Sequence, residues 1–327
     1  MKIISNLNIT ENRIPLDGRF KVKFEGKEID FRVSSLPTTF GQKFVLRVLD
    51  KGNLSIGLDK LGFSPEPLRI FKEAITKPFG MLLVTGPTGS GKSTTLYSVL
   101  NQLNTPERNI VTIEDPVEYQ LEGITQIQVK PDIKLDFATA LRSVLRQSPD
   151  VIMVGEIRDA ETADIAIKAS LTGQLFLSTL HTNDSLSSIT RIIDMGVEPF
   201  LVASSLVMVC AQRLARRMCP NCKTSITVSD EYLKEIGFPL GEKVTFYKSK
   251  GCKHCNNTGF YGRIAILEAI LIDDHLREMI MKQQSLDAVK AYALETLKMK
   301  TLRDDVFIKI KEGLITLDES LRITTEE

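Results

Sequence analysis

The sequence lacks a strong net charge, a long apolar segment and an export signal. Lys and Arg number 42 against 41 Asp and Glu, so nothing draws the whole chain toward nucleic acid or anionic lipid. The most apolar stretch, LVASSLVMVCA at 201–211, is about half as long as a membrane-spanning helix. No apolar core follows the lysine of the start, MKIISNLNIT. We therefore expect a cytoplasmic protein that does not contact nucleic acid directly.

Cysteine is also scarce, but its spacing is informative. Four of the five cysteines form two CxxC pairs, Cys219 with Cys222 and Cys252 with Cys255. Without an export signal this pattern favours metal over disulfides, and four thiolates form a closed structural zinc site. The pairs are further apart than in a compact zinc ribbon, and DEYLKEIGF between them predicts a helix. A redox CxxC pair is the alternative, and Cys210 is expected in the core.

The hydrophobic pattern changes along the chain. Residues 1–50 alternate apolar and polar positions around the turns LDGR and FEGKE, which predicts a small antiparallel β unit. From about residue 82 to 213, apolar runs alternate with helical periodicity, which predicts an α/β fold with a largely parallel sheet. Beyond about residue 270 we expect short amphipathic helices. The expected strands are 81–85, 109–113, 151–154 and 175–179, and the expected helices 92–103, 136–146, 159–171 and 185–194.

The segment GPTGSGKST follows the apolar run MLLVT and opens a helix, as the phosphate-loop pattern G-x-x-x-x-G-K-[ST] requires. Its glycines allow backbone N–H groups to surround a phosphate; Lys92 can bridge the β- and γ-phosphates and Ser93 can bind Mg²⁺. The alternative, a glycine-rich turn with an accidental lysine, does not explain the order of strand, loop and helix. The predicted ATP-binding residues are Gly86, Pro87, Thr88, Gly89, Ser90, Gly91, Lys92, Ser93 and Thr94.

Acidic residues follow two of the expected strands. The run VIMVGEIRD places Glu156 at a strand end, where it can polarise a water, but Gly155 stands where such strands usually carry an aspartate. The neighbouring TIEDPVEY offers Glu114, Asp115 and Glu118 as a replacement. Alternatively, Glu156 is only an exposed charge at the end of its strand.

STLHTND ends a further strand and carries His181 to the same edge of the sheet as the phosphate loop. From spacing alone, a structural and a functional role for this histidine stay equally open.

These segments, in this order, resemble the Walker A, Asp box, Walker B and His box of the type II secretion and type IV pilus assembly ATPases (GspE-like and PilB-like). In that family Walker B ends in Gly-Glu. The resemblance implies a RecA-like P-loop core with Glu156 as catalytic glutamate. It makes Glu118 and Glu114 carboxylates of the Asp box, with Glu118 near the attacking water or its metal. His181 would sense the γ-phosphate.

The resemblance also implies a domain plan: 1–64, a partial second N-terminal domain (PAS-like, β-rich) with a linker; 65–213, the RecA-like core; 214–262, the zinc insert; and 263–327, a C-terminal helical region. NRIPLDGRF resembles the middle of that second domain, so we expect upstream strands and the partner-docking domain to be absent. The implied enzyme is a homo-hexamer using ATP, Mg²⁺ and Zn²⁺. It would work at the inner face of the cytoplasmic membrane, held there by a platform protein and a docking protein, in secretion or pilus assembly.

Arginines outside the phosphate loop are a further prediction. Phosphoryl transfer gains from positive charge on the γ-phosphate, and Arg13, Arg19, Arg32 and Arg47 lie in the β unit. By resemblance such arginines reach the nucleotide when the small domain closes, with Arg19 and Arg32 the strongest candidates; a solvated strand face is the alternative. Three arginines near Walker B are equally compatible with structural ion pairs: Arg142, Arg146 and Arg158.

Two other functions stay open. A P-loop core with a zinc ribbon also suits a nucleic-acid-remodelling protein, and the run RLARRM gives this slight support. Neutral overall charge and the lack of a basic, aromatic-lined strand face count against it. An inactive structural member of a ring is disfavoured by the intact nucleotide motifs.

Overall fold

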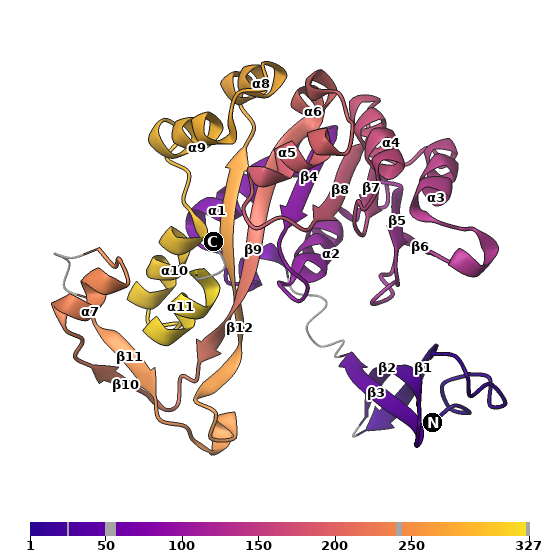
Figure 1. Ribbon diagram of the computed structural model, residues 1–327, viewed down its shortest axis with the longest axis horizontal. Coiled ribbons are helices and arrows are strands. Elements are labelled where there is room, and N and C mark those ends of the chain that lie inside the picture. Colours follow the sequence, from indigo (N-terminus) through magenta and orange to yellow (C-terminus); the bar gives the residue numbers. More distant parts are fainter. Residues whose placement is uncertain (25, 50–56, 240–243, 325–327) are drawn as a thin grey trace. The chain divides into compact units, whose positions relative to one another are not determined.

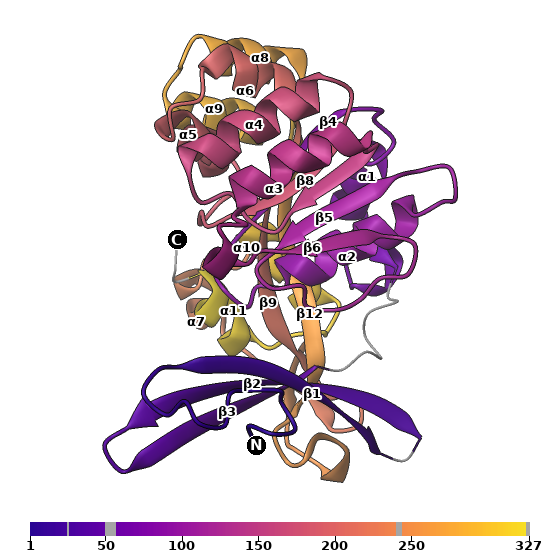
Figure 2. The same cartoon turned by 90° about the vertical axis from the view of Figure 1, so that its right-hand side faces the viewer.

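The computed structural model describes residues 1–24, 26–49, 57–239 and 244–324. The chain forms two compact units (Figures 1 and 2). The first is Met1–Ile56 together with Glu118–Gln120, and the second is Gly57–Val117 with Leu121–Glu327. The first unit contains the predicted antiparallel β region, and the second contains the predicted α/β core.

The first unit is built on a three-stranded antiparallel sheet in its described part, with β1 Leu16–Phe24, β2 Lys27–Thr38 and β3 Gly41–Leu49 in sequence order. Alternation along the strands sorts the side chains onto two faces. One face is apolar, and there the rings of Phe20 and Phe31 stack with centroids 4.9 Å apart. The other face carries charged residues, among them the predicted arginines.

A seven-stranded sheet forms the centre of the second unit, within the residues described, in the order β12-β9-β4-β8-β7-β5-β6. Neighbouring strands run parallel from β9 to β6, and β12 is antiparallel to β9. The predicted α/β fold with a largely parallel sheet is therefore confirmed. The strands are β4 Gly80–Thr85, β5 Ile110–Glu114, β6 Thr125–Gln128, β7 Val151–Val154, β8 Leu175–Leu180, β9 Leu206–Met218 and β12 Phe260–Leu271.

Helices follow these strands where the sequence indicated. The predicted 92–103 helix is α2 Lys92–Leu103, and the predicted starts at 136 and 159 are N-caps, because the carboxylates of Asp136 and Asp159 accept hydrogen bonds from the first turns. The remaining helices of this region are α1 Pro65–Ala74, α3 Phe137–Val144, α4 Ala160–Leu171, α5 Ser187–Asp194 and α6 Pro199–Ser205, with short 3₁₀ turns at Leu58–Lys60, Pro131–Ile133 and Leu145–Gln147. One continuous apolar core joins the sheet to helices α3, α4, α5 and α6.

The apolar stretch 201–211 is divided between the end of α6 and the start of β9. β9 and β12 are long, and they continue as a two-stranded ribbon beyond the sheet (Figure 1). At the far end of this ribbon lie the cysteine pairs, with β10 Lys223–Ile226 paired to β11 Phe246–Ser249 and a 3₁₀ turn at Lys253–Cys255. The helix expected from DEYLKEIGF is α7 Asp230–Glu235. The domain boundaries proposed at 213/214 and 262/263 fall inside β9 and β12, so the cysteine insert extends the sheet's own strands.

The C-terminal part is helical, as expected: α8 Asp274–Met281, α9 Leu286–Glu295, α10 Leu302–Lys311 and α11 Leu317–Thr324. Helices α8 and α9 join the core of the sheet, whereas α10 packs with α7 in a second apolar cluster. Within the described ranges, no helix combines the length and the apolar character needed to cross a bilayer.

Candidate active site

The parallel register brings the predicted nucleotide motifs to one edge of the sheet. The last residue of β4, Thr85, is opposite Leu180 of β8, and Val154 of β7 is opposite Ser178 of β8 and Ile113 of β5. The phosphate loop, the GEIRD turn, the Asp box and the His box all follow these positions. Carboxyl ends of parallel strands are where such sheets bind ligands.

The phosphate loop curls against β9. Gly86 has a φ of +142°, and a Cβ there would lie 2.4 Å from the carbonyl oxygen of Gln212, so only glycine fits. Lys92 opens α2 and donates from Nζ to the carbonyl oxygens of Gly86, at 2.7 Å, and Pro87, at 3.1 Å. A bound phosphate offers stronger acceptors at the same place. Ser93 is exposed in the first turn of α2, where its hydroxyl can bind a metal.

Burial lowers the pKa of Lys92, the charge of Glu156 opposes this shift, and the charge of Arg213 adds to it. These three charges therefore lie within electrostatic reach of one another.

Two residues of this site, both on β9, escaped the sequence analysis. Gln212 is buried, accepts a 2.8 Å hydrogen bond from the hydroxyl of Thr95, and donates a 2.9 Å bond to the carbonyl of Ser90. It thus ties the phosphate loop to the first turn of α2. Arg213, also buried, donates to the carbonyl of Asn183 in the His box at 2.9 Å. The sequence signal for Arg213 is its place in the basic run RLARRM, whereas Gln212, just before that run, carries no local signal.

Glu156 and His181 meet. Nε2 of His181 is 3.1 Å from a carboxylate oxygen of Glu156, and the other oxygen forms an ion pair with Arg158. Burial by itself raises the pKa of Glu156, but the hydrogen bonds and charges of Arg158 and His181 outweigh it and leave the pKa below its usual value. Glu156 is therefore an oriented, ionised carboxylate near neutral pH.

The arginines flanking β7 have different partners. Arg158 reaches from Glu156 to Asp115 of the Asp box, 3.5 Å away. Arg142 of α3 pairs with Glu161 of α4, and Arg146 donates to the carbonyl of Arg142 at 2.8 Å. For Arg142 and Arg146 these contacts match the structural alternative. Arg158, by contrast, touches the proposed base.

Glu114 lies apart from the Glu156–His181 pair. Its side chain is buried at the end of β5, where it accepts hydrogen bonds from the hydroxyls of Tyr97 and Thr112, the latter at 2.6 Å, and from Gln126 at 3.1 Å. A carboxylate so fully bonded is not presented to a water or a metal. Glu118, half-buried, is in the segment that groups with the first unit.

The glycine that replaces the expected aspartate has ordinary surroundings. A Cβ at Gly155 would lie 3.5 Å from the carbonyl oxygen of Ile113 and 3.6 Å from the Cα of Glu114. A side chain there would begin against the backbone of β5.

Three of the predicted arginines of the first unit form a row. Strand register places Arg19 directly opposite Arg32, and Arg32 directly opposite Arg47. Like charges that face each other across strands destabilise a sheet unless an anion compensates. Such a row suits a phosphate-rich ligand. Arg13 lies outside the row and pairs with Glu11 at 3.0 Å.

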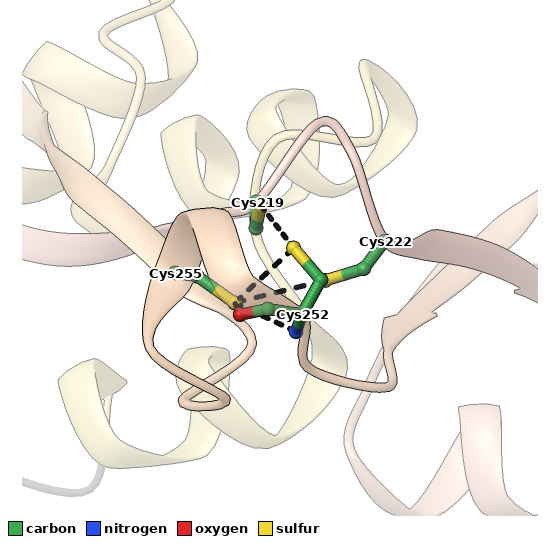
Figure 3. A group of neighbouring side chains, drawn as sticks. All are labelled: Cys219, Cys222, Cys252 and Cys255. Carbon is green, nitrogen blue, oxygen red and sulfur yellow. Dashed lines mark hydrogen bonds between the residues drawn. The ribbon is translucent and has the colours of Figure 1, made fainter.

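The four cysteines converge at the end of the β9–β12 ribbon (Figure 3). Their sulfurs all lie within 4.8 Å of one another, with 3.8 Å between Cys219 and Cys252 and 3.9 Å between Cys222 and Cys255. A zinc tetrahedron with Zn–S bonds of about 2.3 Å places its sulfurs roughly 3.8 Å apart. The donor set therefore fits zinc.

The local environment supports a thiolate at one of the four cysteines, Cys255. Backbone N–H groups of Cys252 and Gly259 donate to Sγ of Cys255 at 3.2 and 3.3 Å. Burial alone would raise the pKa of Cys255, but these donors bring it down to about 6, whereas burial and the neighbouring sulfurs raise the pKa of Cys222 to about 12. Opposite shifts are expected when adjacent thiols share negative charge that a cation would balance. His254 stacks on Tyr261, with ring centroids 4.2 Å apart, and is not one of the clustered ligands.

Comparison with known proteins gives a consistent result. The family described as "Type II/IV secretion system protein" matches residues 1–322. The chain is 52% identical over 323 residues to the type IV pilus assembly ATPase PilB of Myxococcus xanthus, covering 98% of this chain and 57% of that protein. It is 47% identical over 327 residues to the type II secretion system protein E of Dickeya dadantii, covering 100% of this chain and 65% of that protein. It thus spans about three-fifths of the length of these relatives.

Among solved structures, the pilus retraction motor PilT with bound ADP superimposes with a TM-score of 0.70 at 29% identity, over 95% of this chain and 78% of that one. The fold, the order of the motifs and the sequence similarity agree. The chain belongs to the type II/IV secretion system protein family.

Proposed function

We propose that this chain hydrolyses Mg–ATP at the edge of its parallel sheet. The observation that carries the proposal is the Glu156–His181 pair, 3.1 Å apart, at strand ends adjacent to a phosphate loop with an intact lysine and serine. This arrangement has an ionised carboxylate to accept a proton from water and a donor to hold the terminal phosphate. Of the proteins named above, PilB is an ATPase by its name, and the solved structure of the PilT motor contains bound ADP.

Each residue has a distinct role in the proposed mechanism. The backbone of Gly86–Thr94 and Nζ of Lys92 hold the β- and γ-phosphates, and Ser93 ligates Mg²⁺, which neutralises charge on the phosphate oxygens when bound. Glu156 orients the attacking water and takes its proton, while His181 donates to the γ-phosphate. Glu118 is proposed to support the water from the Asp box. Glu114, bonded to Tyr97, acts by holding that box to helix α2.

Positive charge for the transition state is proposed to come from the first unit. Arg19 and Arg32 belong to a cross-strand row with Arg47, and one such row can contact several phosphate oxygens at once. Removal of an arginine supplied to a phosphoryl-transfer site costs about 10³-fold or more in kcat. Arg19→Ala and Arg32→Ala are therefore expected to lower kcat far more than ATP affinity.

The relatives' names suggest the process that this activity serves. We propose a homo-hexamer in which domain closure during turnover moves a platform protein of the inner membrane and so assembles a pilus or pseudopilus. The enzyme would be cytoplasmic and held at the membrane's inner face by that protein and a docking protein. Zinc at Cys219, Cys222, Cys252 and Cys255 is proposed to be structural. The similarity to a pilus ATPase and to a type II secretion protein is of the same order, so both processes are proposed.

The nucleic-acid alternative loses its main sequence support in the structure. Two of the three arginines of RLARRM have partners within the fold: Arg213 binds the His box, and Arg216 forms a 2.8 Å ion pair with the buried Glu319, while Arg217 is exposed. The run therefore gives little support for a phosphate-binding stripe. A salt titration of DNA and RNA binding tests this directly, because true phosphate contacts give a steep dependence on salt.

The decisive experiment compares Glu156→Gln with Lys92→Ala. We expect Glu156→Gln to bind ATP and barely turn it over, and Lys92→Ala to lose binding. If Glu156→Gln retains ATPase activity within about threefold of wild type, a barrier change of only roughly 0.7 kcal/mol, Glu156 is not the base. Deleting the gene and scoring surface filaments against secreted proteins separates pilus assembly from secretion. Absence of ATPase activity in the wild-type chain would instead support a structural ring member.

A further inference from the structure

The His-box loop, residues 181–185, is held by groups that lie outside all four nucleotide motifs. The loop begins with His181, which contacts Glu156, and it leads into α5. Two of its side chains, those of Asp184 and Ser185, bond to the C-terminal part of the chain. The position of His181 therefore depends on elements distant in sequence.

Asp184 is the centre of this anchoring. Its carboxylate accepts 2.7 Å hydrogen bonds from both the backbone N–H and the hydroxyl of Ser187, and a 2.9 Å bond from Nζ of Lys290 on α9. Its carbonyl accepts from the hydroxyl of Thr182 at 3.0 Å. Burial raises the pKa of Asp184, but the bonds from Lys290 and Ser187 outweigh it and leave the pKa below its usual value. Asp184 thus carries a full charge, and Lys290 is its cationic partner.

The surroundings make Lys290 a fixed support. Val289 and Ala293 of α9 are buried in the same core as Ile189 of α5. The hydroxyl of Tyr292, also on α9, donates at 2.7 Å to Asp273, the residue that caps α8. A cation on a helix fixed in this way holds Asp184 at lower entropic cost than a free surface lysine would.

A second contact, at the residue that directly follows Asp184, also comes from the C-terminal part of the chain. Glu268 of β12 is buried and accepts from the backbone N–H of Ser185 at 2.9 Å and from its hydroxyl at 2.5 Å. The two anchoring residues, Lys290 and Glu268, both lie beyond residue 262. The two residues that they hold, Asp184 and Ser185, lie just before α5. The His box is therefore positioned by α9 and by β12, and not only by the strand β8 that leads into it.

We propose that Lys290 is a positioning residue for ATP hydrolysis: through Asp184 it fixes the His-box loop so that His181 meets Glu156. This inference rests on the proposed function, since it assigns Lys290 an effect on the step that Glu156 and His181 perform. Lys290 does not touch the nucleotide. Its loss should lower kcat. It should leave ATP affinity unchanged, because the phosphate loop determines that affinity.

The test uses Lys290→Met, which keeps the length of the side chain and removes its charge, in the full chain. We expect kcat to fall about fivefold, roughly 1 kcal/mol, with KM for ATP within about twofold of wild type. Lys290→Arg should restore kcat to within about twofold. The matched control is Lys282→Met, which removes the exposed lysine at the C-cap of α8 that pairs with Glu278 at 2.5 Å, and it should change neither constant.

Two further variants separate positioning from a general loss of stability. Asp184→Asn keeps an acceptor for Ser187 but weakens the bond to Lys290, so it should lower kcat as Lys290→Met does, and the double variant should lower it no further. In a His181→Gln background, Lys290→Met should change kcat by less than about twofold, because its effect passes through His181.

The outcomes are distinguishable. An unchanged kcat in Lys290→Met, or an equal loss in the His181→Gln background, would overturn the inference. So would a loss in Lys290→Met that Lys290→Arg does not recover. If His181→Gln itself leaves kcat unchanged, the proposed role of His181 fails first. If His181→Gln lowers kcat and Lys290→Met does not, only the present inference fails.

Discussion

The buried contact between Tyr97 and Glu114 gives the sharpest prediction about stability. Tyr97→Phe removes one hydroxyl and no carbon, and leaves Glu114 with its bonds from Thr112 and Gln126. Tyr97 is 2% exposed and Glu114 4%, so water does not replace the lost donor. A hydrogen bond to a buried charged group contributes about 1.5–3 kcal/mol. For a folded unit of this size, that corresponds to a fall in Tm of roughly 3–10 °C.

The assay is urea denaturation followed by circular dichroism, with ATPase activity measured on the same samples at a temperature where each variant is folded. We expect Tyr97→Phe to be destabilised while its kcat stays within about threefold of wild type. Tyr261→Phe, at a ring that is 53% exposed, is the control and should change the free energy of unfolding by less than about 0.5 kcal/mol. A Tyr97→Phe variant as stable as wild type, or one that is stable but inactive, would refute a supporting role for Glu114.

Three other results are expected. Gly86→Ala should abolish ATP binding because its Cβ would lie 2.4 Å from a carbonyl oxygen, whereas Gly89→Ala, with no atom within 4 Å, should cost only about 1–2 kcal/mol of backbone strain in a thermal melt. Metal analysis should find one zinc per chain, lost in Cys222→Ser with partial unfolding by circular dichroism. Because the folded pKa of Glu156 is lowered, its pairing stabilises the protein fully above the unfolded pKa and loses this effect as pH falls through the lower folded pKa. Arg158→Gln should therefore cost under about 1 kcal/mol at pH 7, and this cost should shrink steadily below about pH 4.5 in a denaturation series.

The sheet core was predictable because its signals are local. Strands β4, β5, β7 and β8 are short apolar runs, and β4, β7 and β8 are each followed by a helix. The sequence does not predict the β9–β12 pair. A continuous apolar run such as 201–211 is expected both for the end of a buried helix and for a buried strand, and periodicity does not distinguish the two. The edge strand β6, TQIQ, has too few apolar residues to be recognised. Both misses concern elements whose identity depends on partners far along the chain.

The site was predictable in its motifs but not in its supports. Residue type and spacing identify the phosphate loop and make Glu156 a candidate, whereas a functional role for His181 comes from the family resemblance; the register brings all three to one edge of the sheet. Glu114 carries the same acidic signal as Glu156, yet the structure buries it against Tyr97, a contact that spacing does not reveal. Gln212 and Lys290 carry no local signal, because their roles exist only once β9 and α9 pack beside the loops.

The cysteine insert lies at the end of the β9–β12 ribbon. It could be removed without changing the strand order of the sheet, but its removal would expose side chains that now pack against it. Met218 of β9 is directly opposite Phe260 of β12, so a two-residue turn could join them and delete everything between without disturbing the register of the sheet. The deletion would, however, uncover Leu302 and Phe307 of α10, which now pack against Leu233 and Phe238 of the insert. A shortened chain should therefore fold but aggregate, and recover solubility when these two apolar side chains are made polar. Light scattering of the shortened chain, with and without the two polar substitutions, would test this expectation. It also follows that a lineage that gained or lost the insert had to change the surface of α10 at the same time.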